Sequence, residues 1–321
     1  MKKGFAVLRL LISLVILAVG VGAVWFVSTG HSLPFVSGSD DNPDTLTSSN
    51  EKANSDDLHL SDYSWSELSD ISAEISAAPT DEEGRSIAQS YGLVDANGSL
   101  SDDEIQIELS NGMVVSAQLV GIRHDDKSDG TGKAGLTFIT MQAIANRPVN
   151  SNGDNAGGWQ SCELRAWLNG DALDLFPTDL REHLVSVEKL TNNVGGARDA
   201  SAVSATSDYV WLFSAREVCG QINWFEHEYG ADYAYLDAVP NAEGEQYERF
   251  AQAKVTSSSD PSDTLIRTYQ GNETSWSYRT PFFFVYQNLD GRYFYNVLST
   301  GYPYGYSAPD LSQGVVVGFC V

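Results

Sequence analysis

The segment from residue 157 to residue 217 decides the expected fold. It reads GGWQSCELRAWLN at 157–169, LVSVEKLTNNVGG at 184–196 and VWLFSARE at 210–217. Leu164, Trp167 and Leu168 recur at the spacing of one helix face, which predicts a helix over 162–169. Ser214 and Glu217 stand at the first and fourth positions of a capping box, which predicts a second helix after a short apolar strand. These tryptophan-bearing elements are therefore expected to share one core.

Alternating apolar residues predict strands before this segment. Ile105, Ile107 and Leu109 alternate with polar residues, and Asn-Gly at 111–112 is a strong turn signal before a return strand. Another strand is expected over 136–141.

Strand patterns also follow the segment. Residues 282–286 and 293–298 flank a Leu-Asp-Gly turn signal at 289–291, and 314–321 is an apolar run typical of a buried strand. An irregular, aromatic and acidic stretch separates these strands from the helices. The order of elements predicts an α+β domain over 96–321 with a mostly antiparallel sheet, a few helices and long loops.

Two short helices are expected before the strands. Ser64 and Glu67 form a capping box at the start of the first, and Thr80 with Glu83 repeats the signal at the start of the second. We expect residues 61–95 to form a small helical hairpin.

The N-terminus contains an apolar run over residues 5–27. About 20 apolar residues in a helix span the ~30 Å hydrocarbon core of a bilayer. Lys2 and Lys3 precede the run, so residues 1–4 are expected in the cytoplasm and the rest of the chain outside. The alternative is a cleaved signal peptide, but bulky residues stand at 25–27 where a cleavage site needs small ones. We therefore expect an uncleaved transmembrane anchor.

Composition predicts a linker and excludes one class of partner. Residues 28–60 are rich in Ser, Asp, Asn and Thr, so this segment is expected to be a disordered acidic linker. The formal net charge of the chain is -24. Because such a surface repels phosphate backbones, we expect no nucleic-acid partner.

The chain has 3 cysteines, too few for a disulfide scaffold. In an oxidising exterior Cys320 could pair with either Cys162 or Cys219. Three free buried thiols are the alternative, and the sequence does not choose among these arrangements.

Two motifs are weak signals for small ligands. Residues 130–135 match G-x-G-x-x-G, but a strand pattern follows where the dinucleotide fingerprint requires a helix, so a glycine-rich loop is expected. Asp125, Asp126 and Asp129 make an oxygen-rich loop, which could be a loose metal site or a solvated turn.

Catalytic signals are also weak. The sequence has no G-x-S-x-G elbow, and His-Glu at 227–228 lacks the second histidine of H-E-x-x-H. Cys162 is a possible nucleophile with His124 or His183 as its base, although a thiol on a helix face is more often a packing residue. We expect no catalytic residue and no cofactor.

Aromatic residues are the stronger signal for recognition. Trp167 and Trp211 lie in apolar patterns and are expected in the core. The expected ligand-binding residues follow in later loops, and they are Trp224, Trp276, Arg279, Tyr302, Tyr304 and Tyr306. Aromatic rings beside carboxylates suit stacking on carbohydrate or binding of protein, and Trp276 and the loop at 302–306 are expected to be exposed.

These segments together resemble a functionally uncharacterised domain family of bacterial surface proteins. The family pattern is GGW-x-x-S-x-LR-x-WLN, VWLLS-x-x-E, WWLRSP, DG and GV-x-PGFC, and the likeness covers about residues 63–321. The matching segments here are 157–169, 210–217, 276–281, 290–291 and 314–320. Cys162 replaces the usual Ser, WSYRTP replaces WWLRSP, and Val317 replaces the Pro of PGFC.

The resemblance implies a fold similar to the C-type-lectin-like fold of formylglycine-generating enzymes. The catalytic cysteine pair and copper chemistry of those enzymes are not recognisable here, so catalysis is not carried over. The motifs imply structural roles for a set of residues, namely Trp159, Arg165, Trp167, Trp211 and Glu217. An arginine on one helix and a glutamate starting the next predict an Arg165–Glu217 ion pair, for which Arg279 is a competitor.

The expected function is that of a membrane-anchored extracellular domain that recognises glycan or protein. Two alternatives remain, a cell-envelope enzyme on the same fold and a structural surface module without a ligand.

Overall fold

The computed structural model describes residues 58–258, 260–286 and 289–321. The expected anchor over 5–27 lies outside these residues, as does the expected linker apart from residues 58–60. In the part that is described, no helix has both the length and the apolar composition needed to cross a membrane.

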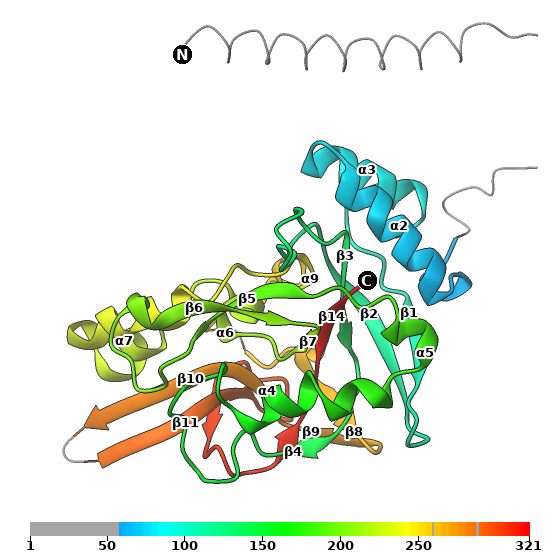
Figure 1. Ribbon diagram of the computed structural model, residues 1–321. Helices are drawn as coiled ribbons and strands as arrows, with labels where there is room; N and C mark the ends of the chain where they lie inside the picture. Colours follow the sequence, from blue (N-terminus) through cyan, green and yellow to red (C-terminus); the bar gives the residue numbers. More distant parts are fainter. Residues whose placement is uncertain (1–57, 259, 287–288) are drawn as a thin grey trace, which may run out of the picture. The chain divides into compact units, whose positions relative to one another are not determined.

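The first sheet is five-stranded and antiparallel. It joins segments that lie far apart in the chain, in the order β1-β2-β3-β14-β7. Its strands are β1 (Glu104–Glu108), β2 (Val114–Ile122), β3 (Leu136–Thr140), β14 (Gly318–Cys320) and β7 (Val210–Trp211). The predicted hairpin at Asn111 and Gly112 joins β1 to β2, which confirms it. Figure 1 shows the red C-terminal β14 inside the molecule between β3 and β7, so the end of the chain completes the sheet.

A second five-stranded sheet has the order β12-β11-β10-β13-β4. Its strands are β4 (Asn146–Arg147), β10 (Trp276–Tyr286), β11 (Leu289–Val297), β12 (Gly305–Ser307) and β13 (Gln313–Gly314). The β10–β13 pair is parallel and the other pairs are antiparallel. Residues 289–291 belong to β11, so the turn predicted there is wrong. The apolar run expected to be one strand over 314–321 instead supplies β13 to this sheet and β14 to the first.

The two predicted N-terminal helices are present as α2 (Trp65–Ala77) and α3 (Asp81–Ser90). Ser64 Oγ accepts a hydrogen bond from Glu67 N, and Thr80 Oγ1 accepts one from Glu83 N, so both capping signals are confirmed. The Trp65 ring lies 5.4 Å from that of Phe138, measured between centroids. The first helix is therefore packed onto β3.

The remaining elements are short. After η2 (Leu60–Asp62), the helices that follow β4 are α4 (Glu163–Leu168), η3 (Asp171–Leu175), α5 (Thr178–Arg181), η4 (Ala200–Ala202), α6 (Ala215–Cys219), α7 (Trp224–Tyr229), η5 (Ala231–Asp237), α8 (Ala238–Asn241), α9 (Glu248–Gln252) and η6 (Asp263–Leu265). Two-stranded ribbons are formed by β5 (Val187–Asn192) with β6 (Val203–Asp208), and by β8 (Arg267–Tyr269) with β9 (Asn272–Thr274). The region expected to be irregular up to residue 272 thus holds several helical turns, each too short to show a periodic pattern.

The Gly-Gly-Trp motif makes a close backbone contact. Gly157 and Gly158 both have positive φ, 80° and 54°. A Cβ atom at Gly158 would lie 1.9 Å from the carbonyl oxygen of Asn192. Two distant motif segments therefore meet here through a glycine that no other residue can replace without strain.

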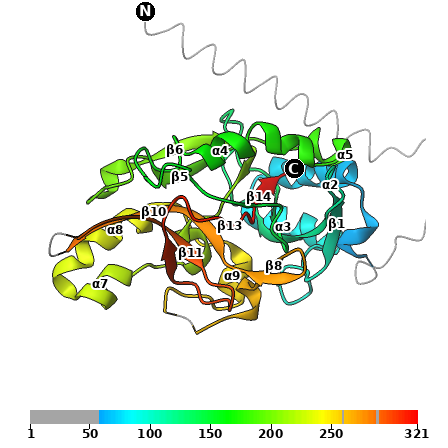
Figure 2. The same cartoon turned by 90° about the horizontal axis from the view of Figure 1, so that it is seen from below.

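Buried side chains form two apolar clusters, and the first sheet contributes to both, with Phe138 in one and Val120 and Ile139 in the other. Trp159 and Trp211 are fully buried in the first, as predicted for Trp211, whereas Trp167 is only partly buried beneath the guanidinium of Arg147 at 4.4 Å. Figures 1 and 2 both show α7 beside β10 and β11, at the end of the molecule away from α2 and α3. The α+β class with mostly antiparallel sheets is confirmed.

Candidate functional site

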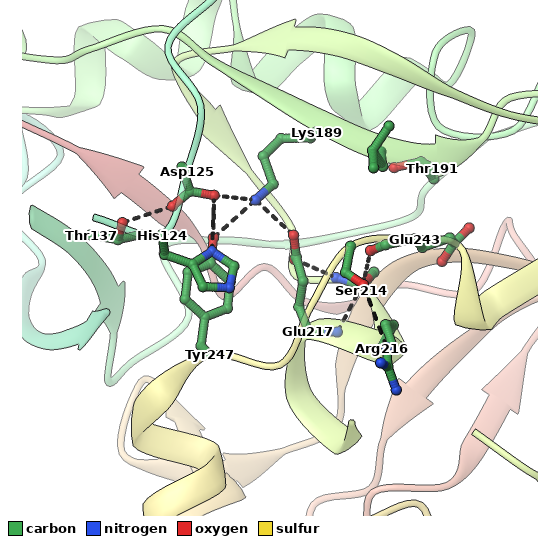
Figure 3. Close-up of polar contacts among 12 residues, drawn as sticks. His124, Asp125, Thr137, Lys189, Thr191, Ser214, Arg216, Glu217, Glu243 and Tyr247 are labelled. Carbon is green, nitrogen blue, oxygen red and sulfur yellow. Dashed lines mark hydrogen bonds and ion pairs between the residues drawn. The ribbon is translucent and has the colours of Figure 1, made fainter. Parts of the chain in front are cut away.

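Four buried charged residues meet between the two sheets, and we call them the buried ion cluster. They are Asp125 after β2, Lys189 on β5, Glu217 on α6 and Arg279 on β10. Figure 3 shows Lys189 reaching between Asp125 on one side and Glu217 on the other. Burial of this many charges is costly unless each is paired, so the contacts decide what the cluster can do.

The ammonium group of Lys189 lies close to three oxygen atoms. Its Nζ lies 2.6 Å from Asp125 Oδ1, 2.6 Å from Glu217 Oε1 and 2.9 Å from the Tyr247 hydroxyl oxygen. The Nζ atom also lies 4.7 Å from the centre of the Trp211 ring, a cation–π distance. The ammonium group is thus shielded from solvent, with 2% of the side chain exposed.

Asp125 is held by hydroxyl groups as well as by Lys189. The Tyr247 hydroxyl donates to Oδ1 at 2.7 Å, and Thr137 Oγ1 donates to Oδ2 at 2.7 Å. The ring of His124 stacks on Tyr247 with 3.8 Å between centroids. Burial alone would raise the pKa of Asp125, but the charge and hydrogen bond of Lys189 together with those of His124 outweigh it and hold the pKa well below the usual value.

Glu217 pairs with Arg279 at two points. Arg279 Nη1 lies 2.5 Å from Oε2 and Nη2 lies 2.7 Å from Oε1. The predicted pairing of Glu217 with Arg165 is wrong, because Arg165 Nε instead donates to Asp208 Oδ1 at 2.6 Å. Asp208 is the last residue of β6, so Arg165 joins α4 to the β5–β6 ribbon and not to α6.

Glu243 borders the cluster and is buried, and among the described residues it forms no ion pair. It accepts hydrogen bonds from the Thr280 hydroxyl and from Asn192 N, the latter at 2.8 Å. Burial raises the pKa of Glu243 to about 7.

A cavity of about 300 Å³ opens onto the cluster. It is lined by His124, Asp125, Asp126, Lys133, Glu188, Lys189, Leu190, Glu217, Gly244 and Glu245. The cluster therefore lies at the floor of a polar opening and is not sealed within apolar side chains.

The aspartates considered for a metal do not converge. Asp125 is committed to Lys189, Asp126 is exposed, and Asp129 accepts from Thr131 in a tight turn. Across the described ranges, no group of three or more His, Cys, Asp or Glu side chains is arranged to hold a metal ion. The glycine-rich segment at 130–135 is a hairpin loop closed by an Asp126–Lys133 bridge, as predicted.

The cysteines are buried, and all 3 are free. Cys162 is 2% exposed and caps α4, where its sulfur accepts from Arg165 N. Burial raises the pKa of its thiol to about 12. A solvent-accessible Cys162 nucleophile is thus contradicted.

Aromatic side chains gather where α7 covers the second sheet, and we call this set the aromatic face. Its members are Trp224, Tyr229, Phe282, Tyr293, Tyr295, Tyr304 and Tyr306. The Trp224 and Tyr304 rings stack at 4.8 Å, and the Tyr306 ring lies 5.1 Å from that of Tyr293. Tyr306 is exposed, and the Tyr304 hydroxyl donates to the carboxylate of Glu228.

The structure separates the predicted binding residues into two groups. Trp276 and Arg279 are fully buried, so the expectation that they contact a ligand is wrong. Trp276 Nε1 donates to the Leu265 carbonyl at 2.9 Å, which explains its inward position. Trp224 is also buried, and its ring stacks on that of Tyr304, which in turn lies beside Tyr306. Tyr302 makes none of the ring contacts given above.

Sequence reasoning missed Lys189 and Tyr293. Lys189 lies between Val187 and Thr191 on the inward-facing positions of β5. The available signal was therefore a lysine at a strand position where an apolar residue is expected. Tyr293 and Tyr295 likewise alternate along β11 on the face that meets α7.

Comparison with known proteins identifies a family. A family model described as a domain of unknown function (DUF6273) matches residues 134–316. No curated protein and no solved structure matches the chain. The matched range contains Lys189, Glu217 and Arg279 together with the aromatic face. Because the match covers more than half of the 321 residues, the chain belongs to the DUF6273 family.

Proposed function

We propose that this protein is a membrane-anchored extracellular recognition domain that binds a glycan on the aromatic face. The observation that carries the proposal is the exposed Tyr306 ring, which lies beside Tyr293 and Tyr304 next to the carboxylate of Glu228. The arrangement offers flat apolar surface and hydrogen-bonding groups at one place.

Sugar rings need that combination. One face of a pyranose presents C–H groups that pack on an aromatic ring, while its hydroxyl groups need donors and acceptors at the edge. Tyr304 and Glu228 supply a hydroxyl and a carboxylate at the edge of the rings. The aromatic face therefore suits a saccharide better than a purely apolar ligand.

The rings are supported from below, which favours binding. Trp224, Phe282 and Tyr295 are buried, and the ring of Trp224 lies 4.7 Å from that of Tyr295. Because the supporting rings are fixed by packing, little conformational entropy is lost when a ligand is bound.

The cellular setting is part of the proposal. The apolar run at 5–27, with lysines before it, favours an anchor whose C-terminal side is extracellular. Residues 28–60 would act as a linker between the anchor and the domain. The two sheets, short helices and long loops support a C-type-lectin-like fold, in which recognition by loops is common.

The test is glycan-array binding of the full chain in mild detergent, with two matched variants. Tyr306→Ala removes a ring that is 43% exposed, and Tyr209→Ala removes one that is 45% exposed on another part of the surface. We expect wild type and Tyr209→Ala to bind the same glycans and Tyr306→Ala to lose them.

Two results would contradict the proposal in different ways. A protein captured by wild type and lost by Tyr306→Ala, with no glycan bound, would make the aromatic face a protein-binding surface. A folded chain that binds neither ligand would favour the structural module.

A further inference from the structure

In the buried ion cluster an amine is held in contact with two carboxylates, as a condensation between them requires. Lys189 Nζ lies 2.6 Å from Asp125 Oδ1 and 2.6 Å from Glu217 Oε1, and 2% of each of the three side chains is exposed. We propose that Lys189 and Asp125 form an intramolecular amide cross-link between Nζ and Cγ, with Glu217 transferring the proton.

Proximity supplies much of what this reaction needs. Groups held in contact react with effective molarities of about 10⁵–10⁸ M, which favours condensation over the separated acid and amine. The Asp125 carboxylate is fixed from both sides by the hydroxyls of Tyr247 and Thr137, each at 2.7 Å. These donors are also placed to stabilise negative charge on the carboxyl oxygens when the amine attacks the carbon.

The step balances without any other reactant. One proton passes from the ammonium group to Oδ1 of Asp125, 2.6 Å away, which leaves a neutral amine beside a neutral carboxyl group. The lone pair of Nζ attacks Cγ and the Nζ–Cγ bond forms. Glu217 Oε1 then takes a second proton from Nζ and gives it to the leaving hydroxyl group, which departs as water. A carboxylate and an ammonium group thus become one amide and one water, and Glu217 regains its starting state.

Glu217 itself is a poorer partner for the amine. Both of its oxygens face Arg279, at 2.5 and 2.7 Å. The guanidinium keeps this carboxylate anionic, and an anionic carboxyl carbon resists attack by a nucleophile. The other contacts of Asp125 are with the hydroxyls of Tyr247 and Thr137, the Cys320 thiol and the His124 ring. Asp125 has no guanidinium partner of this kind, so it is the carboxylate that can take up the proton released by Lys189.

Charge balance favours the product. The cluster contains two acids and two cations, and the amide removes one of each. The remaining Glu217–Arg279 pair stays neutral as a unit, while the energetic cost of burying the other two charges disappears. The cavity of about 300 Å³ that Asp125, Lys189 and Glu217 line gives the released water a way out.

Trypsin digestion of the full chain tests the cross-link directly. Cleavage after Arg123 and Lys127 gives peptide 124–127, and cleavage after Arg181, Lys189 and Arg198 gives 182–189 and 190–198. An amide on Lys189 blocks cleavage there. We expect one branched product of 124–127 joined to 182–198, lighter than the sum of its parts by one water.

Variants separate the linked atoms from their neighbours. Asp125→Asn is expected to give the same branched product with loss of ammonia in place of water, and Glu217→Gln is expected to give no branched product. Asp126→Asn alters the adjacent exposed carboxylate and is expected to leave the linkage unchanged. Near-ultraviolet circular dichroism shows whether each variant is folded.

The wild-type digest decides the proposal whether or not a variant folds. Recovery of 182–189 and 190–198 as separate peptides in full yield would overturn it. If the folded Glu217→Gln variant still gives the branched product, Glu217 does not transfer the proton. If the folded Asp126→Asn variant gives none, the cross-link involves Asp126 and not Asp125.

Discussion

Arg279 and Glu217 form a fully buried, two-point ion pair that joins β10 to the start of α6. Arg279 Nε also donates to Thr191 Oγ1 at 2.7 Å, and Nη1 donates to the Leu212 carbonyl at 2.7 Å. One guanidinium therefore connects the second sheet, the β5–β6 ribbon and the helix that follows β7.

Replacing Arg279 by Met is expected to destabilise the fold strongly. The substitution leaves Glu217 with less compensation in a buried site, and removal of one partner of a buried pair costs about 3–5 kcal/mol. Urea unfolding followed by tryptophan fluorescence measures the change. Arg181→Met is the control, because Arg181 and Asp174 form an exposed pair at 2.6 Å, for which about 1 kcal/mol or less is expected. Equal losses for the two variants would contradict a special role for the buried pair.

The pH dependence of stability is expected to carry the signature of Glu243. Its pKa is about 7 in the fold and 4.5 as the ordinary value, so the folded state binds the proton more tightly. The resulting stability is complete below about pH 4.5 and is lost as the pH rises through 7. Between these values the loss amounts to about 3 kcal/mol.

Glu243→Gln isolates this effect, because it keeps the shape and removes the titration. Unfolding free energies of both proteins at intervals from pH 4 to 8 give the difference. We expect wild type to lose stability relative to the variant as the pH rises. The lowered pKa values of Asp125 and Glu217 act in the opposite direction at lower pH, where those carboxylates become protonated. A difference that is flat or that rises with pH would show that Glu243 is ionised in the fold.

The cysteines are expected to be unreactive in the native state. Burial raises the pKa of Cys162 and Cys219 to about 12 and that of Cys320 well above its usual value. Since the thiolate is the reactive form, iodoacetamide at pH 8 should label none of them until the chain is unfolded, when it should label 3. Mass spectrometry counts the labels, and rapid labelling of the native protein would mean that one thiol is accessible.

The sequence predicted best those features that short-range physics determines. The capping residues Ser64, Thr80 and Ser214 each accept the hydrogen bond expected from position N3. The Asn-Gly turn joins the strands that it was expected to join. Such signals depend on a few neighbouring residues, so no tertiary information is needed to interpret them.

Those local signals do not determine which distant segments or side chains pair with each other. Nothing in residues 314–320 shows that the run divides between two sheets, because both halves are apolar and buried. The partner of Glu217 was open for the same reason, since Arg165 and Arg279 are both compatible with a capping glutamate. The prediction that Trp276 is exposed was wrong. It rested on the polar residues beside this tryptophan, whereas in the structure the indole N–H donates to the Leu265 carbonyl inside the protein.

Tyr306→Phe is expected to separate stacking from hydrogen bonding on the aromatic face. If the ring packs on a sugar, the phenylalanine variant keeps most of the affinity, whereas Tyr306→Ala loses it. The measurement is the Kd of the glycan that wild type binds most tightly. Truncation of one stacking ring is expected to raise this Kd about tenfold, equal to about 1.4 kcal/mol of binding free energy. If both variants lose affinity equally, the hydroxyl of Tyr306 and not its ring makes the contact.

Gly158 is expected not to tolerate a side chain, because of its contact with Asn192. Gly158→Ala must place a Cβ where the Asn192 carbonyl already lies, at 1.9 Å, and must do so with φ at 54°. Gly112→Ala is the matched control, because Gly112 also has positive φ but has no atom near the added methyl group. The control is expected to cost about 1–2 kcal/mol from its backbone conformation alone. Gly158→Ala is expected to cost clearly more, because the 157–169 and 184–196 segments must move apart. Urea unfolding of the two variants measures the difference, and similar losses would mean that the backbone conformation of Gly158, and not its contact with Asn192, is what requires glycine.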